Sequence, residues 1–425
     1  MNPRPQQSPS LMRAAWLAVA LLWPVALLNY MDRQMLAAMK LSVMADITDI
    51  AKDANWGFML GQFKWVYAIF SPLGGYIADR FSRRFTICAS LFIWSIVTWT
   101  TGNATTYDEL LWTRSLMGVS EAFYIPAALA LIADLHSRGT RSRAIGIHQT
   151  AIYCGIIAGG FSGYVADSPM LGWRFAFQAA GITGALYAIP LLFFLRDSRH
   201  SCDSVQTQKS DSFSLPALYR ELFANRSFII LVLCFTLPAL AGWVVKDWMP
   251  AILKEKFPLI GQGMAGVSAT LYVNIASLIG AFAGGWLADK LMRDTVRGRI
   301  YVSALGMSLL IPTLFGVGNS STLLVAILFL TLFGIGWGFF DCNNMPILSQ
   351  IVRPELRATG YGIMNLVSIS CGGLADWGFG ILRDRAVPLN QIFGVFSSLA
   401  LFSVVSVLFI RPSADLAQRE LELSS

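Results

Sequence analysis

Long apolar runs recur along the whole chain, and they constrain its fold more than any other feature. A helix needs about 20 apolar residues to cross the hydrocarbon core of a bilayer. Six such runs precede a polar stretch from Arg196 to Arg226, and six follow it. Only 13% of the residues are charged, about half the roughly 25% that soluble domains carry. The sequence therefore predicts an all-α integral membrane protein with twelve transmembrane helices.

The predicted spans are Trp16–Met39, Gly57–Ala78, Phe85–Thr101, Leu110–Leu135, Ala144–Val165, Phe175–Leu195, Phe228–Leu253, Met264–Ala288, Ile300–Val317, Thr322–Ser349, Ala358–Ile381 and Ile392–Ile410. Most Lys and Arg residues outside these spans lie in the termini and in the loops on the same side as the N-terminus. Positive charge accumulates in cytoplasmic loops. We therefore expect a multi-pass protein of the plasma (inner) membrane with both termini and the central loop in the cytoplasm.

The two halves of the chain repeat each other. Gly74-Gly-Tyr-Ile-Ala-Asp79-Arg80 after span 2 corresponds to Gly284-Gly-Trp-Leu-Ala-Asp289-Lys290 after span 8. Gly118, Glu121 and Pro126 of span 4 recur at the same spacing as Gly338, Asp341 and Pro346 of span 10, and Arg143-Ala-Ile-Gly recurs as Arg357-Ala-Thr-Gly. Two six-span repeats are typical of transporters that work by alternating access. We predict an N-terminal bundle (1–195), a cytoplasmic linker (196–226) and a C-terminal bundle (227–425).

Other function classes lack their signatures. The net charge of +7 comes without a basic block interleaved with aromatics, so nucleic acid is not an expected partner. The six cysteines form no C-x-x-C pair, the three histidines are scattered, and the sequence has no P-loop. No nucleophile–base constellation is present either. We expect no metal, no cofactor and no enzymatic activity, and we expect an ion gradient to supply the energy.

The run Gly75-Tyr-Ile-Ala-Asp79-Arg80-Phe-Ser-Arg83-Arg84 resembles the loop signature of the major facilitator superfamily, although Ser82 stands where that pattern usually has glycine. The resemblance covers the whole chain and implies two six-helix bundles around a central cavity. It also implies that Gly75, Asp79, Arg80, Arg83 and, in the second copy, Asp289 form a gate on the inner side. The alternative is that these arginines only set the topology.

Finer motifs resemble two branches of that superfamily. Asn29-Tyr-Met-Asp32-Arg33 in span 1 and Arg114-Ser-Leu-Met-Gly118-Val-Ser-Glu121 in span 4 are similar to the anion:cation symporters, which carry sugar acids and other carboxylates. Trp248-Met-Pro250 fits that branch too. The same two runs also resemble the spinster-like lysolipid transporters. The resemblance implies either a small organic anion or an amphiphile as substrate.

Charges inside the predicted spans are the candidate site residues, because each costs about 2.5–3.5 kcal/mol to insert at a helix centre. We assign Arg33, Lys64 and Arg114 to substrate binding, and Glu121 and Asp32 to proton coupling. An excess of cations suits a carboxylate substrate. Lys64 lies near a span end, so snorkelling to the interface is its alternative. Asp341, Lys246 and Asp247 are further charges within or near spans.

Helix geometry orders these charges. Arg114 and Glu121 are seven residues apart, so they share a face about 10 Å apart along the helix axis, with Gly118 leaving open space between them. One interpretation is that the two residues belong to a structural stripe of ion pairs between the bundles. The other is that Arg114 binds the substrate and Glu121 carries a proton. Asp32 and Arg33 point about 100° apart, so we expect them to engage other helices.

Polar residues in other spans are candidates for lining the cavity or for joining helices. These residues are Gln149, Lys246, Asn274, Asn343 and Asn365. Taken together, the sequence predicts a monomeric transporter for an anionic small molecule in the lipid bilayer, with protons or sodium as the coupling ion. A lysolipid or other amphiphile is the alternative substrate.

Overall fold

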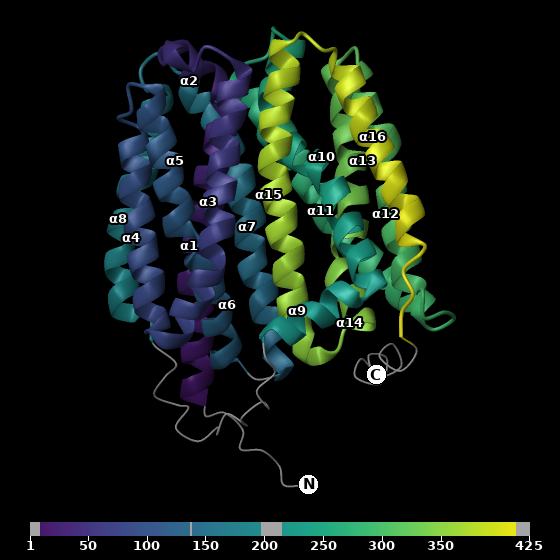
Figure 1. Ribbon diagram of the computed structural model, residues 1–425. Coiled ribbons are helices and arrows are strands. Elements are labelled where there is room, and N and C mark those ends of the chain that lie inside the picture. Colours follow the sequence, from purple (N-terminus) through teal and green to yellow (C-terminus); the bar gives the residue numbers. More distant parts are fainter. Residues whose placement is uncertain (1–8, 137, 197–214, 414–425) are drawn as a thin grey trace. The chain divides into compact units, whose positions relative to one another are not determined.

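The computed structural model describes residues 9–136, 138–196 and 215–413, and these residues form helices joined by short turns (Figure 1). In chain order the helices of the first half are α1 (Pro9–Ala38), α2 (Lys40–Asp46), η1 (Thr48–Ile50), α3 (Asp53–Arg80), α4 (Arg83–Thr101), α5 (Tyr107–Glu121), α6 (Tyr124–Leu135), α7 (Arg138–Ala166) and α8 (Gly172–Phe194). Those of the second half are α9 (Leu215–Ala224), α10 (Arg226–Lys256), α11 (Gln262–Met292), α12 (Gly298–Asn319), α13 (Leu323–Asp341), α14 (Asn344–Ile351), η3 (Pro354–Leu356), α15 (Arg357–Asp384) and α16 (Leu389–Val407).

These helices confirm the predicted all-α membrane architecture. Nine helical stretches of the described chain are long and apolar enough to cross a membrane. Three further helices, α3, α4 and α15, are at least as long as the shortest of those nine. Each predicted span coincides with one of these twelve stretches, when α5 with α6 and α13 with α14 are each taken as one.

The chain divides into two compact units. The first comprises 1–50, 62–207 and 261–266, and the second comprises 51–61, 208–260 and 267–425. In the first unit α1 packs along α7, and α4 packs along α8; in the second, α12 lies against α13 and α16, and α10 lies against α15. The predicted bundle boundaries at 195 and 227 stay a prediction.

The central linker, which the sequence predicts as a polar loop, contains the helix α9. Residues 197–214, including Cys202, lie outside the described part of the chain. Leu222 of α9 is buried in an apolar cluster with Phe228 and Leu231, and Glu221 pairs with Arg353 at 2.5 Å. The buried Leu222 gives this short helix an apolar contact, while Arg220 and Glu221 beside it are exposed, as in an amphipathic element.

Spans 4 and 10 are each broken in the middle, which the sequence analysis did not predict. α5 ends at Glu121 and α6 begins at Tyr124, and α13 ends at Asp341 and α14 begins at Asn344. Pro126 and Pro346 explain both breaks, because a proline has no N–H for the carbonyl four residues earlier and its ring clashes with that carbonyl. Those carbonyls belong to residues 122 and 342, which lie at the breaks.

Candidate functional site

Five charged side chains of low exposure in the first unit lie on three helices, α1, α3 and α5, and Lys40 of α2 is also buried. Asp32 of α1 is 2% exposed, Lys64 of α3 is 4%, Arg114 of α5 is 3% and Glu121 at the end of α5 is 0%. The side chain of Arg33 on α1 is 13% exposed. Buried charges at such depth are costly unless they are paired or serve a function, so their partners decide what the site can do.

Arg33 and Glu121 form a direct ion pair between α1 and α5. Arg33 Nε donates to Glu121 Oε2 at 2.5 Å. Among the described residues, neither Arg33 Nη2 nor Glu121 Oε1 has a hydrogen-bond partner. The pair is therefore half satisfied, and each member keeps one buried polar atom for another ligand or for a different state.

Three aromatic rings surround the guanidinium of Arg33. Its Cζ lies 4.9 Å from the ring centroid of Tyr30, 5.0 Å from that of Phe63 and 4.7 Å from that of Tyr67. A desolvated cation–π contact contributes about 2 kcal/mol or more. The aromatic cage therefore stabilises the charge of Arg33 even when Glu121 does not.

Gly118 brings this cage into place. A Cβ on Gly118 would lie 2.9 Å from the carbonyl oxygen of Phe63, closer than such atoms approach, so the missing side chain lets α3 pack directly on α5. The expectation that Gly118 leaves open space on this face is wrong, because the backbone of α3 fills it. The close crossing holds Phe63 and Tyr67 next to Arg33.

Asp32 and Arg114 are held by threonines of α4. Thr98 Oγ1 donates to Asp32 Oδ2, and Arg114 Nη2 donates to Thr101 Oγ1 at 3.3 Å. Asp32 Oδ1 and Arg114 Nε have no hydrogen-bond partner in the described part of the chain. Arg114 interacts electrostatically with both Asp32 and Glu121, but it forms no ion pair with any described residue.

The prediction that Asp32 and Arg33 engage other helices is confirmed, since their partners lie on α4 and α5. Arg114 and Glu121 form no ion pair with each other among the described residues, and their role as a structural stripe or as a substrate cation beside a proton-carrying carboxylate stays a prediction. The cation of Glu121, the last residue of α5, is Arg33 of α1. Helix spacing shows that Arg114 and Glu121 share a face, but it does not show which neighbouring helix supplies a closer partner.

The carboxylates at the two helix breaks differ in their surroundings. A helix C-terminus carries partial negative charge, so Glu121 and Asp341 both lie where a carboxylate is disfavoured. Arg33 compensates this at Glu121. In the second unit Asp341 is solvent-accessible and meets only the Asn344 amide, 3.5 Å away, as a hydrogen-bond partner. Among the described residues no cation pairs with Asp341.

Lys64 and the predicted cavity residues are less closely organised. Lys64 is 4% exposed, which disfavours snorkelling to the interface. Gln149 is exposed, and Asn274 donates to the Thr270 carbonyl of its own helix at 2.7 Å. In the second unit Lys246 Nζ lies 5.2 Å from the ring centroid of Trp243. Asn343 is buried, and its Oδ1 has no hydrogen-bond partner among the described residues. Asn365 hydrogen-bonds Tyr361. Their role in lining a cavity stays a prediction.

The predicted gate residues make contacts within their own units. Arg83 pairs with Asp134 and donates to the Ala130 carbonyl at 3.0 Å. Arg80 stacks on Tyr76 with 4.7 Å to the ring centroid. Asp289 pairs with Arg299 at 3.3 Å. The surroundings of Gly75 and the side chain of Asp79 lie outside the described part of the structure, so the gating role of all five residues stays a prediction.

Sequence reasoning missed the residues that hold the charges. Thr98 and Thr101 carry no motif, since a threonine in a span is most often bonded to its own helix. The cage of Tyr30, Phe63 and Tyr67 combines two helices whose crossing no local pattern reveals. Only Gly118 gave a usable signal, because small residues let transmembrane helices approach closely.

Comparison with known proteins identifies the family. Residues 22–375 match the model of the Major Facilitator Superfamily, so the chain belongs to that superfamily and is a transporter, not an enzyme. The bacterial homologue of the human lysosomal transporter spinster, solved in an inward-facing, unoccupied conformation, has a TM-score of 0.76 at 21% identity over 95% of both chains. The D-xylose–proton symporter has a TM-score of 0.76 at 17% identity over 94% of this chain and 98% of its own. At such identities the structures establish the fold alone.

Curated relatives include spinster proteins. The chain is 26% identical to Protein spinster of Drosophila melanogaster over 87% of its length and 62% of the relative's. It is 30% identical to Protein spinster homolog 1 of Bos taurus over 70% of its length and 59% of the relative's. The human homolog 1 is 28% identical over 87% of this chain and 73% of that protein. The matches thus span about three fifths of the first two relatives' length.

Proposed function

We propose that this transporter carries a small organic anion, such as a sugar acid or another carboxylate, in symport with a proton by alternating access. The observation that carries the proposal is Arg114. It is a buried arginine of α5 with an unpartnered Nε and no ion pair among the described residues. An arginine offers a planar fork of donors to a carboxylate. The unpartnered Nε is therefore the expected contact for the acidic group of a substrate.

Charge balance links the anion to a proton. Asp32, Arg33, Arg114 and Glu121 sum to zero when all four are ionised, so one anion and one proton can enter together and leave the cluster neutral. Lys64, buried in the same unit, is the third cation proposed for substrate binding. A neutral cluster crosses between conformations at lower cost, because an uncompensated buried charge is expensive.

Glu121 is the proposed proton carrier. When ionised it holds Arg33 at 2.5 Å. Protonation removes its charge and frees the Arg33 guanidinium, which the aromatic cage continues to stabilise. Arg33 can then join Arg114 in holding the substrate anion. Asp32, with one unpartnered oxygen among the described residues, is the second candidate for the proton.

A spinster-like role in moving lysolipids or other amphiphiles is the second candidate function. The observation that favours it is the similarity to spinster proteins over most of this chain. An acidic headgroup would still need Arg114, so the two candidates share the ion-binding chemistry and differ in the apolar part of the substrate.

A ligand screen separates the two candidates. Purified protein is heated with sugar acids, dicarboxylates and lysolipids in turn, and the shift in unfolding temperature is recorded. A ligand that binds the folded state at 100 times its dissociation constant stabilises it by about 2.7 kcal/mol. Stabilisation by carboxylates that Arg114→Gln abolishes supports the first function. Stabilisation by lysolipids alone supports the second, and no stabilisation by any acidic ligand contradicts both.

A further inference from the structure

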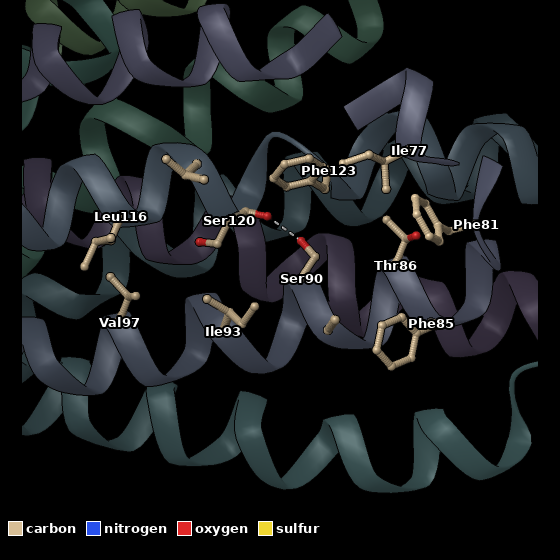
Figure 2. Close-up of a pocket in the computed structure, with 12 residues that line it drawn as sticks. Ile77, Phe81, Phe85, Thr86, Ser90, Ile93, Val97, Leu116, Ser120 and Phe123 are labelled. Atoms are coloured by element: carbon tan, nitrogen blue, oxygen red, sulfur yellow. Dashed lines mark hydrogen bonds between the residues drawn. The ribbon is translucent and has the colours of Figure 1, made fainter. Parts of the chain in front are cut away.

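The first unit carries an apolar groove away from the buried charges (Figure 2). Its twelve lining residues enclose about 470 Å³. They come from the end of α3, from α4, and from the second half of α5 with the turn after it: Ile77, Phe81, Phe85, Thr86, Ala89, Ser90, Ile93, Val97, Leu116, Val119, Ser120 and Phe123. The groove lies wholly within one unit and contains none of the residues assigned to the substrate or the proton.

The groove has an exposed apolar rim and a buried floor. Phe81, Phe85, Ile93 and Leu116 are between 51% and 63% exposed. By contrast, the floor residues Thr86, Ser90, Val97 and Ser120 are at most 7% exposed. In a helix bundle within a membrane, an exposed rim of this kind faces lipid. The surrounding bilayer therefore supplies whatever fills the groove.

The hydroxyl groups in the wall are already satisfied by backbone. Ser90 Oγ donates to the Ser120 carbonyl at 2.5 Å, drawn as the dashed line in Figure 2. Thr86 Oγ1 donates to the Ser82 carbonyl at 3.0 Å, and Ser120 Oγ donates to the Met117 carbonyl at 3.1 Å. The wall thus behaves as apolar, and a polar solute would lose its hydrogen bonds to water without replacement.

The length of the groove matches one leaflet. From Phe85 to Val97 the lining follows α4 for twelve residues, which is about 18 Å at 1.5 Å per residue. Half the hydrocarbon core of a bilayer is about 15 Å. A chain that enters beside Phe81 and Phe85 therefore reaches the middle of the membrane near Ile93, the midpoint of the span 85–101, so the groove is long enough for a single acyl chain of one leaflet.

The end of the groove beside Phe81 and Phe85 is basic. Arg80, Arg83 and Arg84 lie within five residues of chain there, against Asp79 in the same stretch and Asp134, which pairs with Arg83. Arg80 is exposed. Positive residues at a membrane surface attract anionic lipid headgroups, by about 1 kcal/mol per residue. We propose that the groove binds one acyl chain of an anionic bilayer phospholipid whose headgroup lies at these arginines.

This site adjoins the predicted gate. Ile77 and Phe81 line the groove and lie within the Gly75–Arg84 segment, so a seated chain packs directly against the end of α3. The proposal concerns a lipid of the bilayer and does not depend on which substrate is transported.

Photolabelling in proteoliposomes tests the proposal. The probe is phosphatidylglycerol with a diazirine near the end of one acyl chain, and labelled positions are mapped by mass spectrometry. Ala89→Trp fills the groove from α4, with Val119→Phe as a second filling variant from α5. Ile189→Trp is the matched control, because Ile189 is 54% exposed on α8 outside the groove. Size-exclusion profiles identify the variants that fold.

We expect labels on α4 and α5 in the wild type and in Ile189→Trp. The amount of label should be about tenfold lower in the filled variants, which corresponds to losing contact with about two methylene groups. Labelling spread evenly over the lipid-facing helices and unchanged by filling would overturn the site. A phosphatidylcholine probe with the same diazirine serves as the comparison without net charge. Equal labelling by this probe would overturn the assignment of an anionic headgroup. Preferential labelling by a lysolipid probe would overturn the assignment to a bilayer phospholipid.

Discussion

Replacing Glu121 with glutamine should separate substrate exchange from proton coupling. Glutamine has nearly the same shape as a protonated glutamate, so Glu121→Gln imitates the proton-loaded state permanently. The anion site at Arg114 lies about 10 Å along α5 from the substitution and keeps its Thr101 contact. The variant should therefore bind the anion and exchange it across a membrane, since exchange requires no net proton movement.

The size of the effect follows from the coupling ratio. With one proton per anion, a gradient of about one pH unit supplies about 1.4 kcal/mol and can concentrate the anion about tenfold. Glu121→Gln should give no accumulation above the level set by equilibration. Anion binding should be retained or strengthened, because Arg33 is released from Glu121 and keeps the three rings at 4.7–5.0 Å.

The stability cost needs its own measurement. Removing one partner of a buried ion pair costs about 3–5 kcal/mol, and the cage offsets part of that cost through cation–π contacts of about 2 kcal/mol. The variant should thus unfold at a lower temperature but remain folded. Thermal unfolding of Glu121→Gln, Arg33→Gln and the double variant measures the coupling between the two residues.

The assay is uptake and counterflow in proteoliposomes for wild type, Glu121→Gln and Asp32→Asn, each normalised to the amount of folded protein. Exchange without pH-driven accumulation in Glu121→Gln supports Glu121 as the proton carrier. If Glu121→Gln accumulates the anion as the wild type does, the reasoning is refuted and the Arg33–Glu121 pair is structural. Loss of accumulation only in Asp32→Asn would transfer the coupling role to Asp32.

Three further outcomes are expected. Arg114→Lys should weaken binding of the acidic ligand by about 2–5 kcal/mol, because lysine lacks the planar fork; calorimetry showing unchanged affinity would contradict the anion site. Tyr124→Phe should destabilise the fold by about 1–3 kcal/mol without altering proton coupling, since the Tyr124 hydroxyl contacts His148 at 2.9 Å and donates to the Leu22 carbonyl at 3.1 Å. A changed ratio of protons to substrate in transport would instead assign Tyr124 to the mechanism. Cys202 should resist impermeant thiol reagents in intact cells, because the basic loops predict a cytoplasmic linker, and efficient labelling from outside would reverse the predicted orientation.

The spans and the charged residues of the site were predictable because both rest on large free energies. A run of about 20 apolar residues has few alternatives to crossing the bilayer, and a charge such as Arg114 or Glu121 within such a run is too costly to be incidental. The repeat between Glu121 and Asp341 was visible because identical spacings recur in the same order.

The pairing of those charges was not predictable from sequence. Helical phase gives the face on which Glu121 lies, but its partner Arg33 comes from α1, and no local pattern shows which helix approaches that face. The helix breaks after Glu121 and Asp341 follow from prolines that the sequence shows. Proline within a membrane helix often produces only a kink, so Pro126 alone did not predict an interruption.

Proton movement driven by substrate is the most direct test of proton-coupled transport. Purified protein is reconstituted in liposomes that contain a pH-sensitive dye, and sugar acids, dicarboxylates or lysolipids are added outside with no imposed pH gradient. For the exchange measurement, a second set of liposomes is preloaded with unlabelled substrate. The account predicts that an acidic substrate acidifies the lumen in wild-type vesicles, and that Glu121→Gln vesicles take up the same labelled substrate by exchange without acidification. Uptake of substrate by the wild type with no change in luminal pH would contradict it.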